Sequence, residues 1–163
     1  MSIFYKQVRI GQFGKPFTIY KFRTMCEGAD KMGGPSTPAD DPRLTRIGKF
    51  LRKYQIDELP QLWNILKGDM SFVGPRPEVP EYIDLLTDEQ KKIILSVRPG
   101  LTDLATLANM SEGERLRGSK DPEKKYLEVI RPEKIRLQIK YVKTRSIWLD
   151  TRILLKTIYR IFR

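Results

Sequence analysis

Between residues 55 and 77 the hydrophobic residues follow a helical period. An apolar side chain returns every three or four positions, at Leu59, Leu62, Trp63 and Leu66. This spacing predicts a helix from about Leu59 to Lys67 with one apolar face. Pro60 suits the first turn of such a helix, where its missing N–H has no helical partner in any case, and Gly68 suits the C-cap.

Two adjacent carboxylates precede this predicted helix. Asp57 and Glu58 would stand at its N-terminus, where the backbone dipole stabilises negative charge and can also hold a phosphate. Farther along, Gly74-Pro75-Arg76-Pro77 predicts a rigid turn that presents a single guanidinium. A carboxylate pair, a helix N-terminus and a fixed arginine suit phosphoryl chemistry. On spacing alone, however, acidic residues in a first turn are common caps, and an arginine between prolines is usually part of a surface turn.

Alternating polar and apolar residues near the start of the chain predict a β-hairpin. Its arms are residues 7–10 and 17–22, joined by a turn at residues 11–14. Five basic residues precede the first acidic residue, Glu27: Lys6, Arg9, Lys15, Lys21 and Arg23. Their simplest interpretation is a solvated strand edge that discourages aggregation. We prefer that interpretation for Lys6 and Lys15.

Residues 26–41 are rich in glycine and proline and predict an irregular, mobile connector without a phosphate-binding loop pattern. Apolar spacing, helped by proline or threonine at several starts, predicts further helices at residues 44–52, 80–86, 88–97, 122–129 and 132–144. Most basic residues of the first of these are expected on a solvated face. No internal repeat interrupts the chain, so the predicted fold class is α+β, a mostly helical single domain over residues 1–163 with a small N-terminal hairpin.

The last stretch, residues 147–162, predicts an amphipathic helix. Four basic residues recur at steps of four, four and three and would form one stripe, at Arg152, Lys156, Arg160 and Arg163. With Trp148 near its start, such a helix could lie at a membrane surface, in the headgroup region. A helix that packs on the core and turns a charged face outward fits the pattern equally well.

Charge and composition limit the classes of binding partner but do not select one of them. The 163 residues include 31 Lys and Arg against 20 Asp and Glu, a net charge of +11, which implies an anionic partner such as nucleic acid, phospholipid headgroup or phosphorylated substrate. The lack of histidine excludes a His-dependent triad, and the single cysteine, Cys26, excludes an internal disulfide. No apolar run approaches the roughly 20 residues of a bilayer span, so no segment of this chain is expected to cross a membrane by itself.

The wording DELPQLWNILKGDMSFVGPRPE resembles the signature of the bacterial sugar transferase family, the monotopic phosphoglycosyl transferases that start glycan assembly on a polyprenol phosphate. The segments QVRIGQFGKPFTIYKFRTM, RPGLTDLATL and YVKTRSIWLDTRILLKT agree, so the resemblance covers nearly the whole chain. Asp103 and Leu104 occupy the place where well-known members favour a Gly-Trp pair, and we therefore assign no site residue to residues 101–118. The re-entrant hydrophobic helix that normally precedes this segment in the family is not in the sequence, which implies a shortened chain or a start site set too late.

The resemblance implies an enzyme that transfers a sugar-1-phosphate from a nucleoside diphosphate sugar to a polyprenol phosphate of the undecaprenyl type. The reaction releases a nucleoside monophosphate and initiates synthesis of exopolysaccharide, capsule, O-antigen or glycoprotein glycans. The resemblance assigns Asp57 as the nucleophile of a covalent aspartyl-phosphosugar and Glu58 as its partner. It implies Mg²⁺ held by Asp57 and Glu58, with Lys21, Arg52 and Arg76 binding substrate phosphates. It also implies a monotopic or peripheral protein on the cytoplasmic face of the bacterial inner membrane, in contact with anionic lipid.

Other classes of protein stay open at this stage. A nucleic-acid binder would also be basic, but here the basic residues are not interleaved with exposed aromatics or placed on a recognised motif, so we expect no nucleic-acid partner. A glycosidase is a poor match, because its two carboxylates flank the scissile bond from opposite sides. An inactive membrane-associated remnant and a basic anion-binding module are the alternatives to the enzyme. The sequence does not indicate the oligomeric state.

Overall fold

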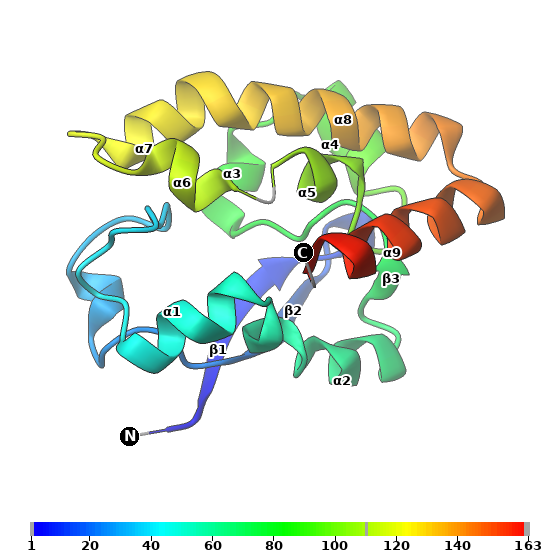
Figure 1. Ribbon diagram of the computed structural model, residues 1–163. Helices are drawn as coiled ribbons and strands as arrows, with labels where there is room; N and C mark the ends of the chain where they lie inside the picture. Colours follow the sequence, from blue (N-terminus) through cyan, green and yellow to red (C-terminus); the bar gives the residue numbers. More distant parts are fainter. Residues whose placement is uncertain (1, 110, 162–163) are drawn as a thin grey trace.

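The structure is a computed structural model and describes residues 2–109 and 111–161 of the chain (Figure 1). Its elements are, in order, β1 Phe4–Ile10, η1 Gln12–Gly14, β2 Pro16–Phe22, η2 Ala29–Lys31, α1 Arg46–Lys53, η3 Ile56–Glu58, α2 Gln61–Leu66, β3 Ser71–Val73, α3 Pro80–Asp84, α4 Asp88–Ile94, β4 Gly100–Thr102, α5 Leu104–Ala108, α6 Glu112–Leu116, α7 Pro122–Lys125, η4 Tyr126–Ile130, α8 Arg131–Thr144 and α9 Ile147–Ile161. The elements η1 to η3 are 3₁₀ turns and η4 is a π-helical turn. The predicted α+β class, mostly helical with a small N-terminal hairpin, is confirmed.

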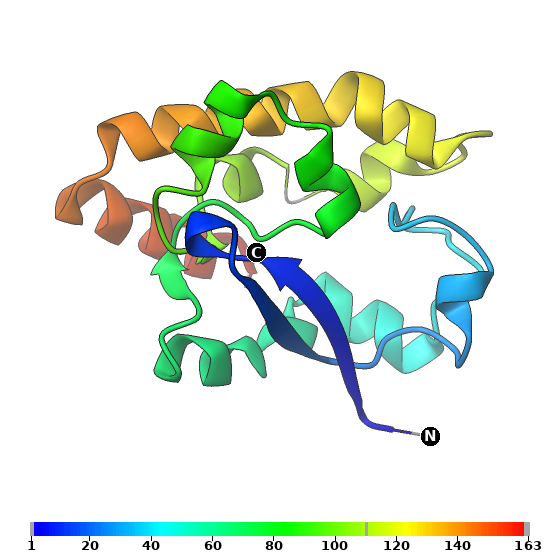
Figure 2. The ribbon, with the colours of Figure 1, turned by 180° about the vertical axis from the view of Figure 1, so that it is seen from behind.

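The molecule has a helical half and a half built on the hairpin. Figure 1 shows α7, η4 and α8 as one long helical run at the top, with α4 behind it and α3, α5 and α6 beneath it, while the hairpin, α1 and α2 lie below. Seen from behind, the hairpin lies in front (Figure 2), and its strand β2 contacts η3 and α2. After α8 the chain turns and α9 runs back along β3, β4 and α5.

The predicted hairpin is confirmed and begins three residues earlier than expected. Strands β1 and β2 pair antiparallel from Phe4 opposite Phe22 to Ile10 opposite Pro16. A second pair, β3 and β4, is parallel and was not predicted, because three-residue strands leave little pattern in the sequence.

Most of the core lies in the helical half. Buried apolar side chains form three clusters: Val79, Tyr82, Leu116, Tyr126 and Ile130; Val73, Leu107, Tyr141 and Ile153; and Ile83, Leu86, Ile94 and Ile135. Burying one Leu or Ile side chain contributes about 1.5–3 kcal/mol, so these clusters fix the helices that surround the site. Because Ile153 belongs to the second cluster, one face of α9 is part of the core.

The predicted break between residues 129 and 132 is wrong. Instead of two separate helices, α7 continues through the π-turn η4 into α8 without interruption. Pro132 lies inside this continuous run, directly after the π-turn, where the regular helical hydrogen bonding is already interrupted. The helix at 80–86 and the Thr87-capped helix after it are confirmed, although α3 and α4 are each shorter at the C-terminal end.

Two close backbone crossings require glycine. A Cβ on Gly100 would lie 2.0 Å from the nitrogen of Gly74, and a Cβ on Gly48 would lie 1.9 Å from the carbonyl oxygen of Thr24. The first crossing holds the Gly74–Pro77 turn against β4, and the second holds α1 against the segment that follows β2. Both segments carry candidate site residues. No helix among the described residues has the length and apolarity needed to span a bilayer.

Candidate active site

Asp57 and Glu58 lie in the 3₁₀ turn η3, and not at the N-terminus of α2 as predicted. Gln55 adopts the left-handed conformation, with φ of 53°, which separates this turn from α1. Helix α2 begins only at Gln61, after Pro60, and has six residues. The idea that a helix dipole supports the two carboxylates is therefore wrong. The turn is positioned instead by its contacts with β2 and α1.

Helix α2 turns its polar side chains inward and its apolar side chains outward. Gln61 and Asn64 are buried, whereas the residues of the predicted apolar face are 40–80% exposed: Leu59, Leu62, Trp63 and Leu66. Asn64 donates through Nδ2 to the Thr18 carbonyl at 2.7 Å and accepts at Oδ1 from the Tyr20 N–H at 3.3 Å. It thereby fastens α2 to β2 and fixes the position of η3. Sequence reasoning missed Asn64, because an apolar stripe usually marks the buried face of a helix.

Glu58 is held by two of the predicted cations. Lys21 Nζ lies 3.1 Å from Glu58 Oε1, and Arg76 donates from Nη1 to Glu58 Oε2 at 3.1 Å and from Nη2 to Oε1. Burial alone would raise the pKa of Glu58, but the charges of Arg76 and Lys21 lower it far below its ordinary value. Burial lowers the pKa of Lys21, an effect that Glu58 opposes. Glu58 is therefore a permanently ionised group whose two oxygens are already engaged.

Asp57 has a different environment although it is the adjacent residue. Its side chain is buried, at 7% exposure for the residue, and no hydrogen bond or ion pair reaches its carboxylate from residues 2–109 and 111–161. Burial and then the charge of Glu58 raise the pKa of Asp57, against the opposing charges of Lys21, Arg52 and Arg76. Asp57 is thus the carboxylate of the pair that is free to react.

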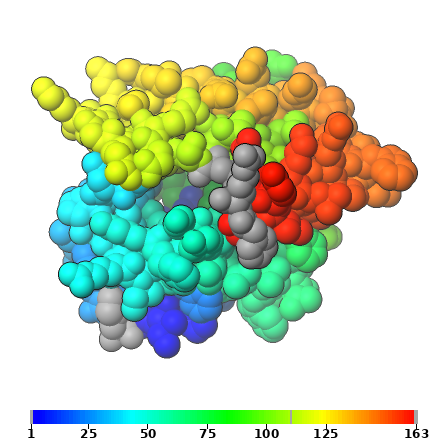
Figure 3. All heavy atoms as spheres, viewed as in Figure 1, coloured from blue at the N-terminus to red at the C-terminus, as the bar shows by residue number. Residues whose placement is uncertain are grey.

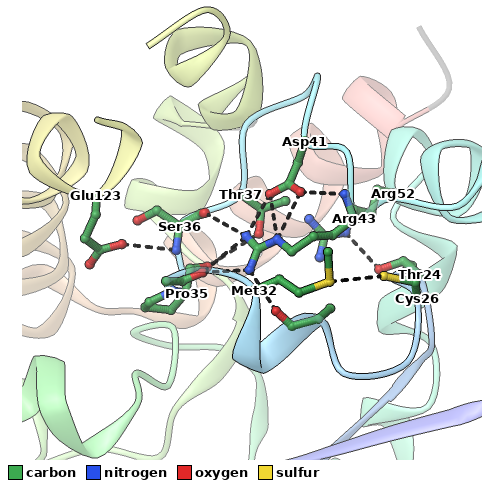
Figure 4. Close-up of polar contacts among 12 residues, drawn as sticks. Thr24, Cys26, Met32, Pro35, Ser36, Thr37, Asp41, Arg43, Arg52 and Glu123 are labelled. Atoms are coloured by element: carbon green, nitrogen blue, oxygen red, sulfur yellow. Dashed lines mark hydrogen bonds and ion pairs between the residues drawn. The ribbon is translucent and has the colours of Figure 1, made fainter. Parts of the chain in front are cut away.

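Arg52 approaches the pair from α1. Its Nε donates to Thr24 Oγ1 at 3.0 Å (Figure 4). Burial lowers the pKa of Arg52, and among the charges that oppose this effect Asp57 comes first. The structure thus gathers all five residues that the sequence singled out: Asp57, Glu58, Lys21, Arg52 and Arg76.

The segment 26–41 is irregular as predicted, but it is anchored by a buried arginine. Arg43 was expected on a solvated helical face, but it precedes α1 and is buried. Its Nη2 donates to Asp41 Oδ2 at 2.7 Å (Figure 4). It also donates to the carbonyls of Ala29, Gly34 and Ser36. These bonds contradict the prediction that the segment is only a mobile connector. Sequence analysis could not find them, because one arginine in a basic run looks like its neighbours.

The same segment joins the two halves of the molecule beside the site. The Ser36 N–H donates to Glu123 Oε2 at 3.3 Å, and the Ala39 N–H donates to the Gly113 carbonyl at 2.9 Å. Figure 3 shows the molecular surface hollowed between α1 and the segment of α6. Both bonds lie in the segment that precedes α1, the helix that carries Arg52.

The donor set fits Mg²⁺ in a limited way. No cluster of three or more Asp, Glu, Cys or His suited to a metal occurs in the described part of the chain. Mg²⁺ commonly takes one or two protein carboxylates and completes its octahedron with phosphate oxygens and water. Asp57, which is unpaired among the described residues, fits that role, whereas the oxygens of Glu58 already accept bonds from Lys21 and Arg76.

These features belong to a known class of protein. A model of the family described as bacterial sugar transferase matches residues 1–163, so the chain belongs to the bacterial sugar transferase family. Among curated relatives it is 42% identical over 159 residues to the uncharacterized sugar transferase EpsL of Bacillus subtilis. It is 37% identical over 162 residues to the UDP-N-acetylgalactosamine-undecaprenyl-phosphate N-acetylgalactosaminephosphotransferase of Aeromonas hydrophila. It is 38% identical over 156 residues to the UDP-glucose:undecaprenyl-phosphate glucose-1-phosphate transferase of Caulobacter vibrioides.

The matches cover nearly all of this chain but differ in their share of the relatives. They include 98%, 96% and 94% of this chain and 69%, 34% and 54% of the three relatives, in the same order. The chain thus spans between about a third and two thirds of the proteins that it matches.

Proposed function

We propose that this protein transfers a sugar-1-phosphate from a nucleoside diphosphate sugar to undecaprenyl phosphate through a covalent intermediate on Asp57. The observation that carries the proposal is the contrast within the carboxylate pair. Glu58 is engaged by Lys21 and Arg76, while Asp57 is buried, unpaired among the described residues and close to the charge of Arg52. Relatives named as undecaprenyl-phosphate transferases of N-acetylgalactosamine phosphate and glucose-1-phosphate support the same reaction.

The reaction consists of two displacements at one phosphorus atom. In the first, an oxygen of Asp57 attacks the phosphorus that bears the sugar. The bond from that phosphorus to the bridging oxygen breaks, and the nucleoside monophosphate leaves with the electron pair. In the second, a phosphate oxygen of undecaprenyl phosphate attacks the same phosphorus and releases the Asp57 carboxylate. Splitting the transfer in this way replaces one difficult step by two easier ones.

Cations are needed because an anion must attack a polyanion. Lys21 and Arg76 both bind Glu58, and their charges offset the repulsion that Glu58 exerts on Asp57. Arg52, whose described bond is to a neutral hydroxyl, can bind a phosphate oxygen directly. Mg²⁺ held by Asp57 and the substrate would add charge neutralisation at the phosphates.

A lipid acceptor requires contact with the membrane. Exposed apolar side chains suited to that contact occur on three helices, and we name them together the apolar surface. It comprises Ile47 and Phe50 of α1, Leu59, Leu62, Trp63 and Leu66 at α2, and Ile147, Trp148, Leu155, Ile158 and Tyr159 of α9. In Figure 1, α1 and α9 lie at the front and α2 below them. We propose that this surface rests on the inner membrane, on the cytoplasmic side where nucleotide sugars are available.

The predicted basic stripe of α9 is only partly available for this contact. Arg152 and Lys156 are exposed, but Arg160 donates to the carbonyl of Leu107. Arg163 lies outside the described residues.

The proposal is tested by incubating the protein with a panel of nucleotide sugars and undecaprenyl phosphate and measuring release of nucleoside monophosphate. Asp57→Asn removes the nucleophilic charge at almost constant size, so release should fall at least about a thousand-fold. The matched control is Asp84→Asn, the same chemical change at an exposed position of α3. With donor alone, acid-quenched wild-type protein should carry one sugar phosphate on the peptide that contains Asp57. Turnover by Asp57→Asn at near the wild-type rate, together with no adduct, would refute the covalent mechanism.

A further inference from the structure

Arg9 is a cation near the candidate site that has no role in the mechanism above. The hairpin register pairs Arg9 with Phe17 and Tyr5 with Lys21, so Arg9 and Lys21 lie on the same face of the hairpin. The next residue, Ile10, donates its N–H to the carbonyl of Glu78 at 3.1 Å. That bond joins this end of β1 to the turn that carries Arg76. Arg9 therefore lies where the hairpin meets the Arg76 turn.

The guanidinium of Arg9 lacks a direct acidic partner within the described ranges. Its hydrogen bond there runs from Nη2 to the neutral amide oxygen of Gln7 at 2.6 Å, and its Nε is buried without a bond. Burial lowers the pKa of Arg9 and the charge of Arg76 lowers it further. A desolvated cation in this state costs folding free energy, and an anion that binds beside it recovers that cost.

The carboxylates in the neighbourhood are committed elsewhere. Glu58 is shared by Lys21 and Arg76, and Glu78 pairs with Arg131 at 3.4 Å. A structural role is the alternative, because Glu78 Oε1 is buried and unbonded in the described residues and a water could join it to Arg9. The two roles predict opposite effects on stability, as set out below.

Two guanidiniums near the acidic pair thus come from different elements and have no carboxylate bonded to them in the described residues. Among the groups that raise the pKa of Arg52, Asp57 has the largest effect. The groups that raise the pKa of Arg9 are Tyr5, Glu78 and Glu58. Arg52 is also among the charges that lower the pKa of Asp57. Arg52 comes from α1, where it bonds Thr24, and Arg9 comes from the end of β1 that is joined to the Arg76 turn. A nucleoside diphosphate sugar carries two linked phosphates, which matches two separated cations.

We propose that Arg9 binds the donor phosphate that Asp57 does not attack, the one that leaves on the nucleoside monophosphate. This inference rests on the proposed function. Arg9 is then a substrate-binding residue whose positive charge stabilises the leaving group as its negative charge increases. It also explains why the fold keeps a partly buried arginine without a carboxylate bonded to it.

The test measures binding apart from turnover, in protein that carries Asp57→Asn. The probes are uridine 5′-monophosphate and UDP-glucose, chosen because the named relatives use uridine nucleotides, followed by the monophosphate of any other donor that the panel identifies. Arg9→Gln should raise the Kd of the monophosphate about ten- to a hundred-fold, the usual effect of a lost charge-assisted hydrogen bond. Arg9→Lys should recover part of the affinity. Lys6→Gln, which removes a charge from an exposed position on the opposite face of β1, is the matched control and should have no effect.

Each result has a definite meaning. If the Asp57→Asn protein binds no donor and no monophosphate, the proposed function fails. If it binds them and Arg9→Gln binds equally well, only the inference about Arg9 is overturned. The inference is also overturned if Arg9→Gln slows only the second step, transfer from Asp57 to undecaprenyl phosphate, or if it lowers the melting temperature of ligand-free protein as a structural role requires. A ligand-binding role predicts a melting temperature equal to or above that of the parent.

Discussion

At the scale of single residues, Asp57 and Glu58 show how two adjacent carboxylates acquire different chemistry. A 3₁₀ turn has three residues per turn, so successive side chains point about 120° apart and meet different neighbours. Glu58 meets Lys21 and Arg76, whereas Asp57 meets a partly desolvated space near Arg52. Glu58 is therefore held by two cations, and Asp57, the proposed nucleophile, has no bonded partner among the described residues.

The two carboxylates should have opposite effects on stability. Because the pKa of Asp57 is raised, stability falls as the pH rises from the unfolded pKa to the folded pKa and stays lower above it, so Asp57→Asn should raise the melting temperature at pH 7. The lowered pKa of Glu58 means that its ion pairs stabilise the fold above the unfolded pKa, and that this stability is lost as the pH falls toward the folded pKa. Glu58→Gln should lower the unfolding free energy by about 2–3 kcal/mol, less than for a fully buried pair because Arg76 keeps some exposure. Equal melting temperatures for both variants would contradict this assignment.

The same difference predicts the pH dependence of the reaction. The nucleophile must be ionised, so kcat/KM should fall on the acid side at the raised pKa of Asp57, above the value of about 4 that is usual for Asp. Glu58→Gln removes a charge that raises this pKa and frees the two cations that lower it. In the residual activity of that variant, the acid limb should therefore move to lower pH. A limb that moves to higher pH would show that a group other than Asp57 controls it.

Arg76 has a planar guanidinium that bonds to both oxygens of Glu58. Arg76→Lys keeps the charge but allows only a single-point contact, so kcat/KM should fall about ten-fold or more. The fold should survive, because Lys still pairs with Glu58. Arg98→Lys, at an exposed arginine, is the matched control. Wild-type kinetics for Arg76→Lys would show that only the charge matters at this position.

At the scale of elements, the sequence predicted the location of several helices better than their orientation. The hairpin followed directly from alternation, and the Thr87 cap marked the start of α4 correctly. The apolar stripe at α2 was predicted, but it faces outward. An apolar stripe indicates that a helix packs against something apolar, and the sequence does not distinguish protein from lipid. The partners of Glu58 come from β2 and from the turn after β3, and no local pattern joins those segments. Resemblance to a family singled out Lys21, whereas Arg76 was already marked by its position between two prolines.

The attachment of α2 depends on Asn64. Asn64→Ala leaves the Thr18 carbonyl and the Tyr20 N–H without this partner, so the unfolding free energy should fall by about 2–3 kcal/mol. Because η3 directly precedes α2, the loss of activity should exceed what the unfolded fraction explains. Leu66→Ala, at the most exposed position of the helix, should leave both stability and soluble activity nearly unchanged. Denaturant titration and kinetics on the same samples separate the two effects. A variant that loses stability but keeps full activity when folded would show that Asn64 does not position η3.

At the scale of the whole molecule, the site lies where the two halves meet. The hairpin and α1 supply Lys21 and Arg52, the η3 turn supplies the carboxylates, and the chain between β3 and α3 brings Arg76. The bonds from Ser36 and Ala39 then join the hairpin half to the helical half beside the hollow. This arrangement could not be predicted from patterns in the sequence, since it depends on the buried Arg43 and on contacts between segments more than fifty residues apart.

The apolar surface gives the whole molecule one side that is suited to lipid, and its contribution can be measured. Replacing Leu62, Trp63 and Leu66 together by Gln removes exposed apolar area without touching a described core cluster, so binding to vesicles that contain anionic lipid should fall at least ten-fold. Leu85→Gln, which changes an exposed leucine outside the apolar surface, is the control and should bind normally.

Charge should contribute separately to this binding. Replacing Arg152 and Lys156 by Gln should reduce binding mainly at low salt, because each exposed cation near an anionic surface contributes about 1 kcal/mol and added salt screens it. The triple α2 variant should instead stay weak at every salt concentration. Co-sedimentation across a salt series distinguishes the electrostatic contribution to vesicle binding from the apolar one. If the triple variant binds vesicles as tightly as the parent, α2 does not face the lipid, and its outward apolar side chains must then be covered by protein.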